Sequence, residues 1–127
     1  MKLRHDPGSW ERLEMECRRI CDECRNASWD GYGAEPISEP ALEAGLQFLT
    51  VAAAAGAPPP EVCPTCDGCL CFEWHGEPGT LAASVPRRGW VDFAFLGTPE
   101  RQHGSGQFAE GFPPMFTKLL CLFCEPN

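Results

Sequence analysis

The stretch Cys69-Leu70-Cys71-Phe72-Glu73-Trp74 alternates large apolar side chains with cysteines and a glutamate. This alternation marks the point where the chain changes from a helical to an extended pattern. A period of two is typical of a strand with one buried face. Comparable patterns follow in residues 80–85 and 90–95, and short glycine-containing turns separate them. Three consecutive strands with short turns predict an antiparallel meander.

Two helices are predicted before these strands. In residues 9–25, apolar side chains recur at helical spacing and form one stripe. Residues 39–55 carry a second stripe, and Ser38 is a good N-cap residue for it. We therefore expect a single α+β domain over residues 1–127. Its two N-terminal helices would pack on a three-stranded or slightly larger antiparallel sheet.

The C-terminal part of the chain has a less regular pattern. Residues 97–111 contain four glycines among mostly polar side chains, which predicts a mobile loop. Residues 115–124 are apolar and follow two prolines. They predict a short C-terminal helix, with a final edge strand as the alternative.

The chain is evenly acidic. Its 18 Asp and Glu residues outnumber 10 Lys and Arg residues, which gives a formal net charge of −8. A negative surface repels phosphate backbones, so we expect no direct nucleic-acid binding. The first residues lack the apolar run of a signal peptide, and residues 51–60 are too few to span a bilayer. These features predict a cytoplasmic protein without membrane association.

Nine cysteines raise the question of a metal site. The odd number and a reducing cytoplasm argue against a disulfide framework. Core packing is the favoured interpretation for the C-x-x-C pairs Cys21/Cys24 and Cys121/Cys124, because a free cysteine behaves as a small hydrophobe. We expect no cofactor, and zinc is the alternative. Two thiolates separated by two residues can bind one Zn²⁺, and the candidate ligands are Cys63, Cys66, Cys69 and Cys71.

Common catalytic motifs are absent from the sequence. It contains no phosphate-binding glycine loop, no H-E-x-x-H motif and no nucleophile elbow. The remaining enzymatic alternative is a nucleophile and base formed by Cys71 and His75. The sequence therefore favours a protein that is not an enzyme.

Two motifs carry a resemblance to a family. Residues 29–34 read Trp-Asp-Gly-Tyr-Gly-Ala and are followed by Pro36-Ile37, and residues 67–74 read Asp-Gly-Cys-Leu-Cys-Phe-Glu-Trp. The chain thereby resembles a group of small bacterial and phage proteins with a helix, a WDGYGA-x-P-I connector, a second helix and an antiparallel sheet. The resemblance implies this fold over residues 9–96 and implies no activity. The cysteines are not part of the shared pattern.

Two groups of side chains are candidates for contact with a partner, because exposed aromatic and arginine residues dominate protein interfaces. They are Trp29, Asp30 and Tyr32 in the connector, and Arg87, Arg88 and Trp90 around a predicted turn. We hypothesise a phage or mobile-element inhibitor that occupies a surface of a host defence or toxin protein, as anti-CRISPR proteins and antitoxins do. That surface would include a basic nucleic-acid-binding groove. A zinc-stabilised module using Cys63 and Cys66 is the alternative, and a small thiol enzyme is the second alternative.

Overall fold

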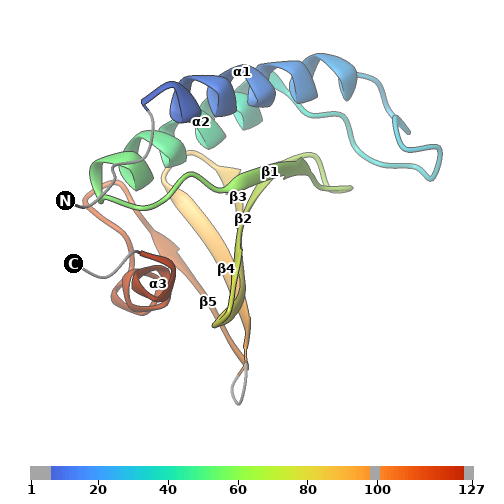
Figure 1. The fold of residues 1–127 in the computed structure, drawn as a ribbon. Coiled ribbons are helices and arrows are strands. Elements are labelled where there is room, and N and C mark those ends of the chain that lie inside the picture. The colour runs from blue at the N-terminus through green and yellow to red at the C-terminus, as the bar shows by residue number, and fades with distance from the viewer. Residues whose placement is uncertain (1–6, 98–100, 125–127) are drawn as a thin grey trace.

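A computed structural model describes residues 7–97 and 101–124 of the chain. Within these residues the strands form one antiparallel sheet with the order β1-β2-β3-β4-β5 (Figure 1). The elements are α1 (Pro7–Glu23), α2 (Glu39–Ala54), β1 (Glu61–Pro64), β2 (Leu70–Gly76), β3 (Gly79–Arg87), β4 (Trp90–Gly97), β5 (Arg101–Gln107), α3 (Pro114–Leu120) and the 3-10 turn η1 (Cys121–Phe123). The α+β prediction is confirmed, and the sheet, which was expected to have three strands or slightly more, has five.

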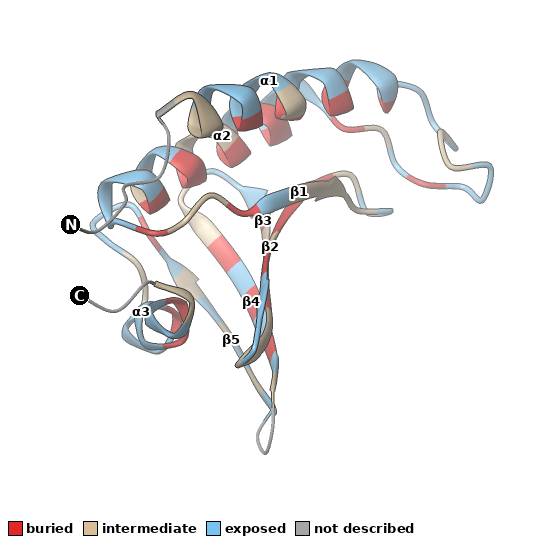
Figure 2. Ribbon diagram, in the orientation of Figure 1, coloured by how far each residue is buried: buried red, intermediate tan, exposed pale blue. Residues whose placement is uncertain are grey.

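Helix α2 covers one face of the sheet, and α1 lies over α2 and β1. The Oγ atom of Ser38 accepts a hydrogen bond from the amide of Ala41 at 3.2 Å, so the predicted N-cap is present. Gly45 is buried where α2 meets β2, and a Cβ atom there would lie 2.8 Å from the Cδ1 atom of Leu70. The missing side chain therefore allows close packing of helix on sheet. Figure 2 shows the buried side of both helices turned toward the sheet.

An aromatic cluster forms the core between α2, α3 and the inner face of the sheet. Phe48 of α2 stacks on Phe72 of β2 with the ring centroids 5.1 Å apart. The ring of Phe108 lies 5.5 Å from Phe48 in an edge-on arrangement, and the ring of Phe116 lies 6.0 Å away. Edge-to-face and offset pairs of this kind add stability beyond the area they bury. The core thus joins the second helix, the central strands and the C-terminal segment.

Strand β5 contradicts the predicted mobile loop at residues 97–111. Residues 98–100 lie outside the described part of the chain, but Arg101–Gln107 pairs with β4 along its length. Glycine at positions 104 and 106 has a packing reason. A Cβ atom at Gly104 would lie 2.9 Å from the ring of Phe93, and one at Gly106 would lie 2.8 Å from Pro113. The glycines let neighbouring rings approach the backbone, so a glycine-rich polar sequence forms a strand here.

The structure adds a strand before the predicted strands and forms a helix after them. Strand β1 was not among the predicted strands. It has only four residues and one strongly apolar side chain, Val62, so its sequence shows no period. At the C-terminus the predicted short helix is confirmed by α3 and η1, and the alternative edge strand is not formed there. Within residues 7–97 and 101–124, no helix has both the length and the apolar character needed to cross a membrane.

Candidate functional site

The β1–β2 hairpin brings two of the candidate zinc ligands together. Its turn is closed by hydrogen bonds from the amide of Thr65 to the carbonyl of Cys69 at 2.8 Å and from the amide of Gly68 to the carbonyl of Thr65 at 3.1 Å. Gly68 has a φ of +88°, which favours glycine at this position. The resulting register pairs Cys63 directly with Cys71 across the two strands.

Glu73 completes a cluster with these two thiols. It lies two residues beyond Cys71 on the same strand, and side chains two apart point to the same face of a sheet. One oxygen of its carboxylate and the Sγ atoms of Cys63 and Cys71 all lie within 4.8 Å of one another. We call Cys63, Cys71 and Glu73 the thiol–carboxylate cluster. Cys71 is buried, whereas Cys63 and Glu73 are partly accessible to solvent.

Both thiols of the cluster favour the protonated form. Burial raises the pKa of Cys71 to about 11, against a hydrogen bond with Ser84 that lowers it. Burial likewise raises the pKa of Cys63, and the negative charge of Glu73 adds to this. Without a bound cation, neither thiol has the lowered pKa of a reactive cysteine.

The other two predicted zinc ligands lie outside the cluster. Cys66 is exposed in the hairpin turn. Cys69 is buried, and its Sγ atom lies 3.2 Å from the hydroxyl of Thr65. Glu73 was not among the predicted ligands, although the alternation along β2 places it on the same face as Cys71. Among the remaining pairs, Cys21 and Cys24 are buried as expected, whereas Cys121 is exposed and Cys124 is partly buried.

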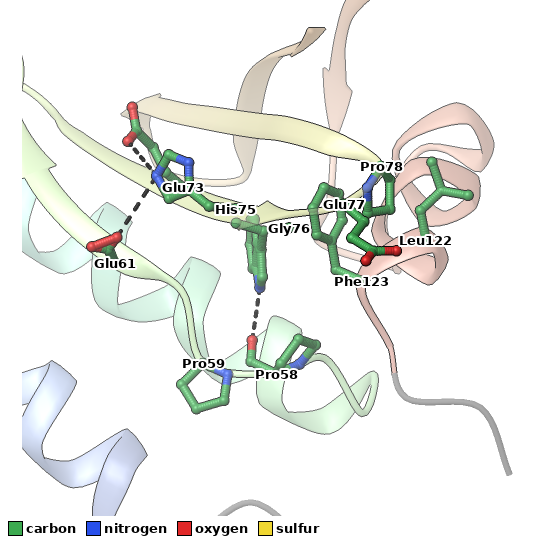
Figure 3. Close-up of a pocket in the computed structure, with 11 residues that line it drawn as sticks. Pro58, Pro59, Glu61, Glu73, His75, Gly76, Glu77, Pro78, Leu122 and Phe123 are labelled. Carbon is green, nitrogen blue, oxygen red and sulfur yellow. Dashed lines mark hydrogen bonds and ion pairs between the residues drawn. The ribbon is translucent and has the colours of Figure 1, made fainter. Parts of the chain in front are cut away.

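His75 binds groups other than the cysteine proposed as its catalytic partner. Its Nδ1 atom lies 3.1 Å from the hydroxyl of Thr80, and its Nε2 atom lies 3.1 Å from the carboxylate of Glu73. The Nε2 atom is also 3.7 Å from the carboxylate of Glu61 (Figure 3). In this structure the ring nitrogens of His75 thus have Thr80, Glu73 and Glu61 as partners.

An acidic pocket of about 410 Å³ adjoins this histidine. Three carboxylates line it, from Glu61, Glu73 and Glu77, together with the ring of Phe123. Figure 3 shows Glu61, Glu73 and His75 at one end of the pocket and Glu77, Leu122 and Phe123 at the other, with Pro58 and Pro59 along its edge. Negative charge beside apolar surface suits a cationic side chain of a partner better than a phosphate.

The connector between α1 and α2 holds the first group of predicted contact residues. The indole N–H of Trp29 donates to the carbonyl of Glu35 at 2.7 Å, and the ring packs against the core. A carboxylate oxygen of Asp30 accepts from the amides of Tyr32 at 2.8 Å and Ala34 at 3.1 Å. Trp29 and Asp30 therefore hold the loop, whereas the side chain of Tyr32 is 92% exposed.

The second predicted group lies on the β3–β4 turn. Arg87 and Arg88 are exposed, and the guanidinium of Arg87 lies 4.7 Å from the ring centroid of Trp90. The indole N–H of Trp90 donates to the carboxylate of Asp92 at 2.9 Å. The turn is joined to α2 by a hydrogen bond from the amide of Gly89 to the side chain of Gln47 at 2.9 Å. The structure thus brings Arg87 and Trp90 into contact, on a loop separate from Tyr32.

Comparisons with protein-family models, with curated proteins and with solved structures found no match for this chain.

Proposed function

We propose that this protein is a non-enzymatic binding protein that inhibits a partner protein by occupying its surface, with Tyr32 as the anchor of the contact. The observation that carries the proposal is the exposure of Tyr32, which is 92% accessible at the tip of a fixed loop. Tyrosine in such a place is typical of interface hot spots, because it buries a large ring and keeps a polar end.

The loop around Tyr32 is fixed before any partner arrives. The Oγ atom of Ser28 accepts from the amide of Gly33 at 2.9 Å, and the amide of Ser28 donates to the carbonyl of Ala34 at 2.7 Å. Ser28 itself has a φ of +59°, a conformation that costs energy for a residue other than glycine. A loop already ordered in the free protein loses little conformational entropy on binding, which favours affinity.

The charge of the chain supports a partner with a basic surface. The net charge is −8. Two arginines of α1 are paired with acids on the same helix, Arg18 with Glu14 and Arg19 with Glu16 and Glu23, and Arg25, just beyond the helix, is paired with Asp22. The acidic pocket adds three carboxylates on another surface. A basic nucleic-acid-binding groove of a host defence or toxin protein has the complementary charge. The proposed mode of action is therefore that of an anti-CRISPR protein or an antitoxin.

A capture experiment with matched variants tests the proposal. Tagged wild type, Tyr32→Ala and Met15→Ala serve as baits in a bacterial host lysate. Met15 is the matched control, because it is a large apolar side chain that is 68% exposed but lies on α1 rather than on the loop. We expect wild type and Met15→Ala to enrich the same protein, and Tyr32→Ala to lose it.

The captured protein is then purified and its affinity is measured at about 50 mM and about 300 mM salt. Screening of opposite charges lowers the affinity at the higher salt concentration. Equal capture by Tyr32→Ala and wild type would contradict the anchor. An affinity that does not change with salt would contradict the basic groove.

A further inference from the structure

We propose that Cys63, Cys71 and Glu73 bind one Zn²⁺ ion, with a water molecule as the fourth ligand. This site is independent of the proposed partner contact, because it lies on the β1–β2 hairpin and uses none of the connector residues. It also differs from a C-x-x-C site, since its two cysteines face each other from neighbouring strands.

The spacing of the three ligand atoms suits a small tetrahedral ion. They all lie within 4.8 Å of one another. Bonds of ~2.0–2.3 Å to zinc place tetrahedral ligands about 3.3–3.8 Å apart. Small rotations of the three side chains are enough to bring them to one ion. Paired strands hold their backbones in place, which keeps the loss of entropy on binding low.

The surroundings favour a cation over an anion or a neutral ligand. Glu61 lies opposite Glu73 in the strand register, so two carboxylates flank the thiols on one face of the hairpin. Like charges directly opposite each other destabilise a strand pair, and a bound cation removes that cost. Partial exposure of Cys63 and Glu73 leaves a path for the ion from solvent.

A second set of contacts holds the carboxylate ligand. His75 lies between Glu73 and Thr80, at 3.1 Å from each. Hydrogen bonds of this kind orient metal ligands, and their loss typically reduces affinity about 10–100-fold. His75 is thus a positioning residue for Glu73.

The two thiolate ligands determine which metal ion the site prefers. Soft sulfur ligands favour zinc over magnesium or calcium, which prefer oxygen. Binding converts two thiols, one carboxylate, one water molecule and Zn²⁺ into a complex with two zinc–sulfur bonds, one zinc–carboxylate bond and one zinc–water bond, and it releases two protons to solvent. The complex carries a net charge of about −1, counting two thiolates and one carboxylate against the ion.

The test uses the full chain, purified with a reductant that does not bind metals. The protein is freed of metal and then titrated with Zn²⁺, and the zinc that remains bound after dialysis is measured by mass spectrometry. Cobalt(II) titration follows the charge-transfer absorption that a thiolate ligand produces. We expect one zinc per chain and a thiolate-to-cobalt band in the wild type.

Variants identify the ligands. Cys63→Ser and Cys71→Ser are expected to lose affinity more than ~100-fold, and Glu73→Gln at least ~10-fold. Cys66→Ser is the matched control for the C-x-x-C alternative, and Cys69→Ser is the control for the neighbouring buried thiol. Both are expected to bind zinc as the wild type does. Glu73→Gln keeps the result interpretable even if a cysteine variant fails to fold, because its side chain is partly exposed.

Two results would overturn the zinc site. The first is a zinc content near zero in the reduced wild type. The second is a loss of affinity in Cys66→Ser as large as in Cys63→Ser, which would assign the metal to the turn instead. Tyr32→Ala is expected to bind zinc normally, so failure of this proposal and failure of the partner contact are distinguished.

Discussion

The two faces of β2 differ in chemistry, although one strand carries both. Leu70, Phe72 and Trp74 point toward α2 and are buried, while Cys71, Glu73 and His75 point to the opposite face. On the inner face, aromatic rings interlock with Phe48. On the outer face, thiol, carboxylate and imidazole groups lie beside one another.

The side chains of the inner face stabilise the fold, whereas those of the outer face are available to bind a ligand. A buried ring in a close-packed core leaves a cavity when it is removed. An accessible carboxylate is replaced by water at little cost. Substitutions at neighbouring positions of one strand should therefore have very different effects.

The largest difference is expected between Phe72→Ala and Glu73→Ala. Phe72 is fully buried and stacks on Phe48, so its removal should lower the free energy of unfolding by about 3–5 kcal/mol. Glu73→Ala should change it by less than about 0.5 kcal/mol, since the substitution also removes repulsion from Glu61. Urea unfolding of the metal-free protein measures both. Similar losses of the free energy of unfolding in the two variants would contradict the claim that only the inner face of β2 stabilises the fold.

The inner face could be predicted from sequence, and most of the outer face could not. Alternation along 70–74 identifies the strand and its buried side without knowledge of any neighbour. The pairing of Cys63 with Cys71 depends on the register of a hairpin whose first strand is only four residues long. A short strand has too few side chains to show a period, so the sequence favoured the local pair Cys63 and Cys66 as ligands.

Strand β5 and the exposure of Tyr32 could not be predicted from the sequence, for two further reasons. Gly104 and Gly106 fit under rings from Phe93 and Pro113, and this packing is a long-range property that no local pattern records. Tyr32 was predicted together with Trp29 and Asp30 as a contact residue, yet the latter two hold the loop. Which aromatic side chain is exposed depends on the hydrogen bonds of the folded connector.

The next largest effect on stability is expected at alkaline pH, where the thiol of Cys17, which is buried on α1, loses its proton. Burial raises the pKa of Cys17 from an ordinary value of 9.0 to about 12. The folded state therefore holds the proton more tightly than the unfolded state. The stabilisation is complete below pH 9 and is lost as the pH rises toward 12. As the pH rises from about 9 to about 11, this thiol ionises in the unfolded state but not in the folded state. The free energy of unfolding should therefore fall by about 2–3 kcal/mol.

Urea unfolding across this pH range gives the measurement. Cys17→Ala is expected to show a smaller fall with pH than the wild type. Cys66→Ser, which removes an exposed thiol, should retain the whole fall. An identical pH dependence in Cys17→Ala and wild type would mean that burial does not govern this thiol.

Loss of the cap on α2 should have a smaller effect. Ser38→Ala removes the acceptor for the amide of Ala41 and leaves the helix that covers the inner face without its N-cap. We expect a loss of about 1 kcal/mol in the free energy of unfolding. Ser105→Ala on β5 is the control, because that side chain is exposed. A loss confined to Ser105→Ala would show that the cap does not stabilise the inner face.

The smallest effect on stability is expected at Tyr32. A small change in the free energy of unfolding there would show that the tyrosine is not needed for the fold. The side chain is 92% exposed, so Tyr32→Ala should change the free energy of unfolding by less than about 0.5 kcal/mol. Asp30→Ala, which removes the acceptor for two loop amides, should cost about 1 kcal/mol by the same measurement. A loss at Tyr32 as large as that at Asp30 would assign the tyrosine to the fold. A small loss at Tyr32 beside a larger loss at Asp30 is the result that the proposed role of Tyr32 as an anchor requires, because an anchor must be free of a role in the fold.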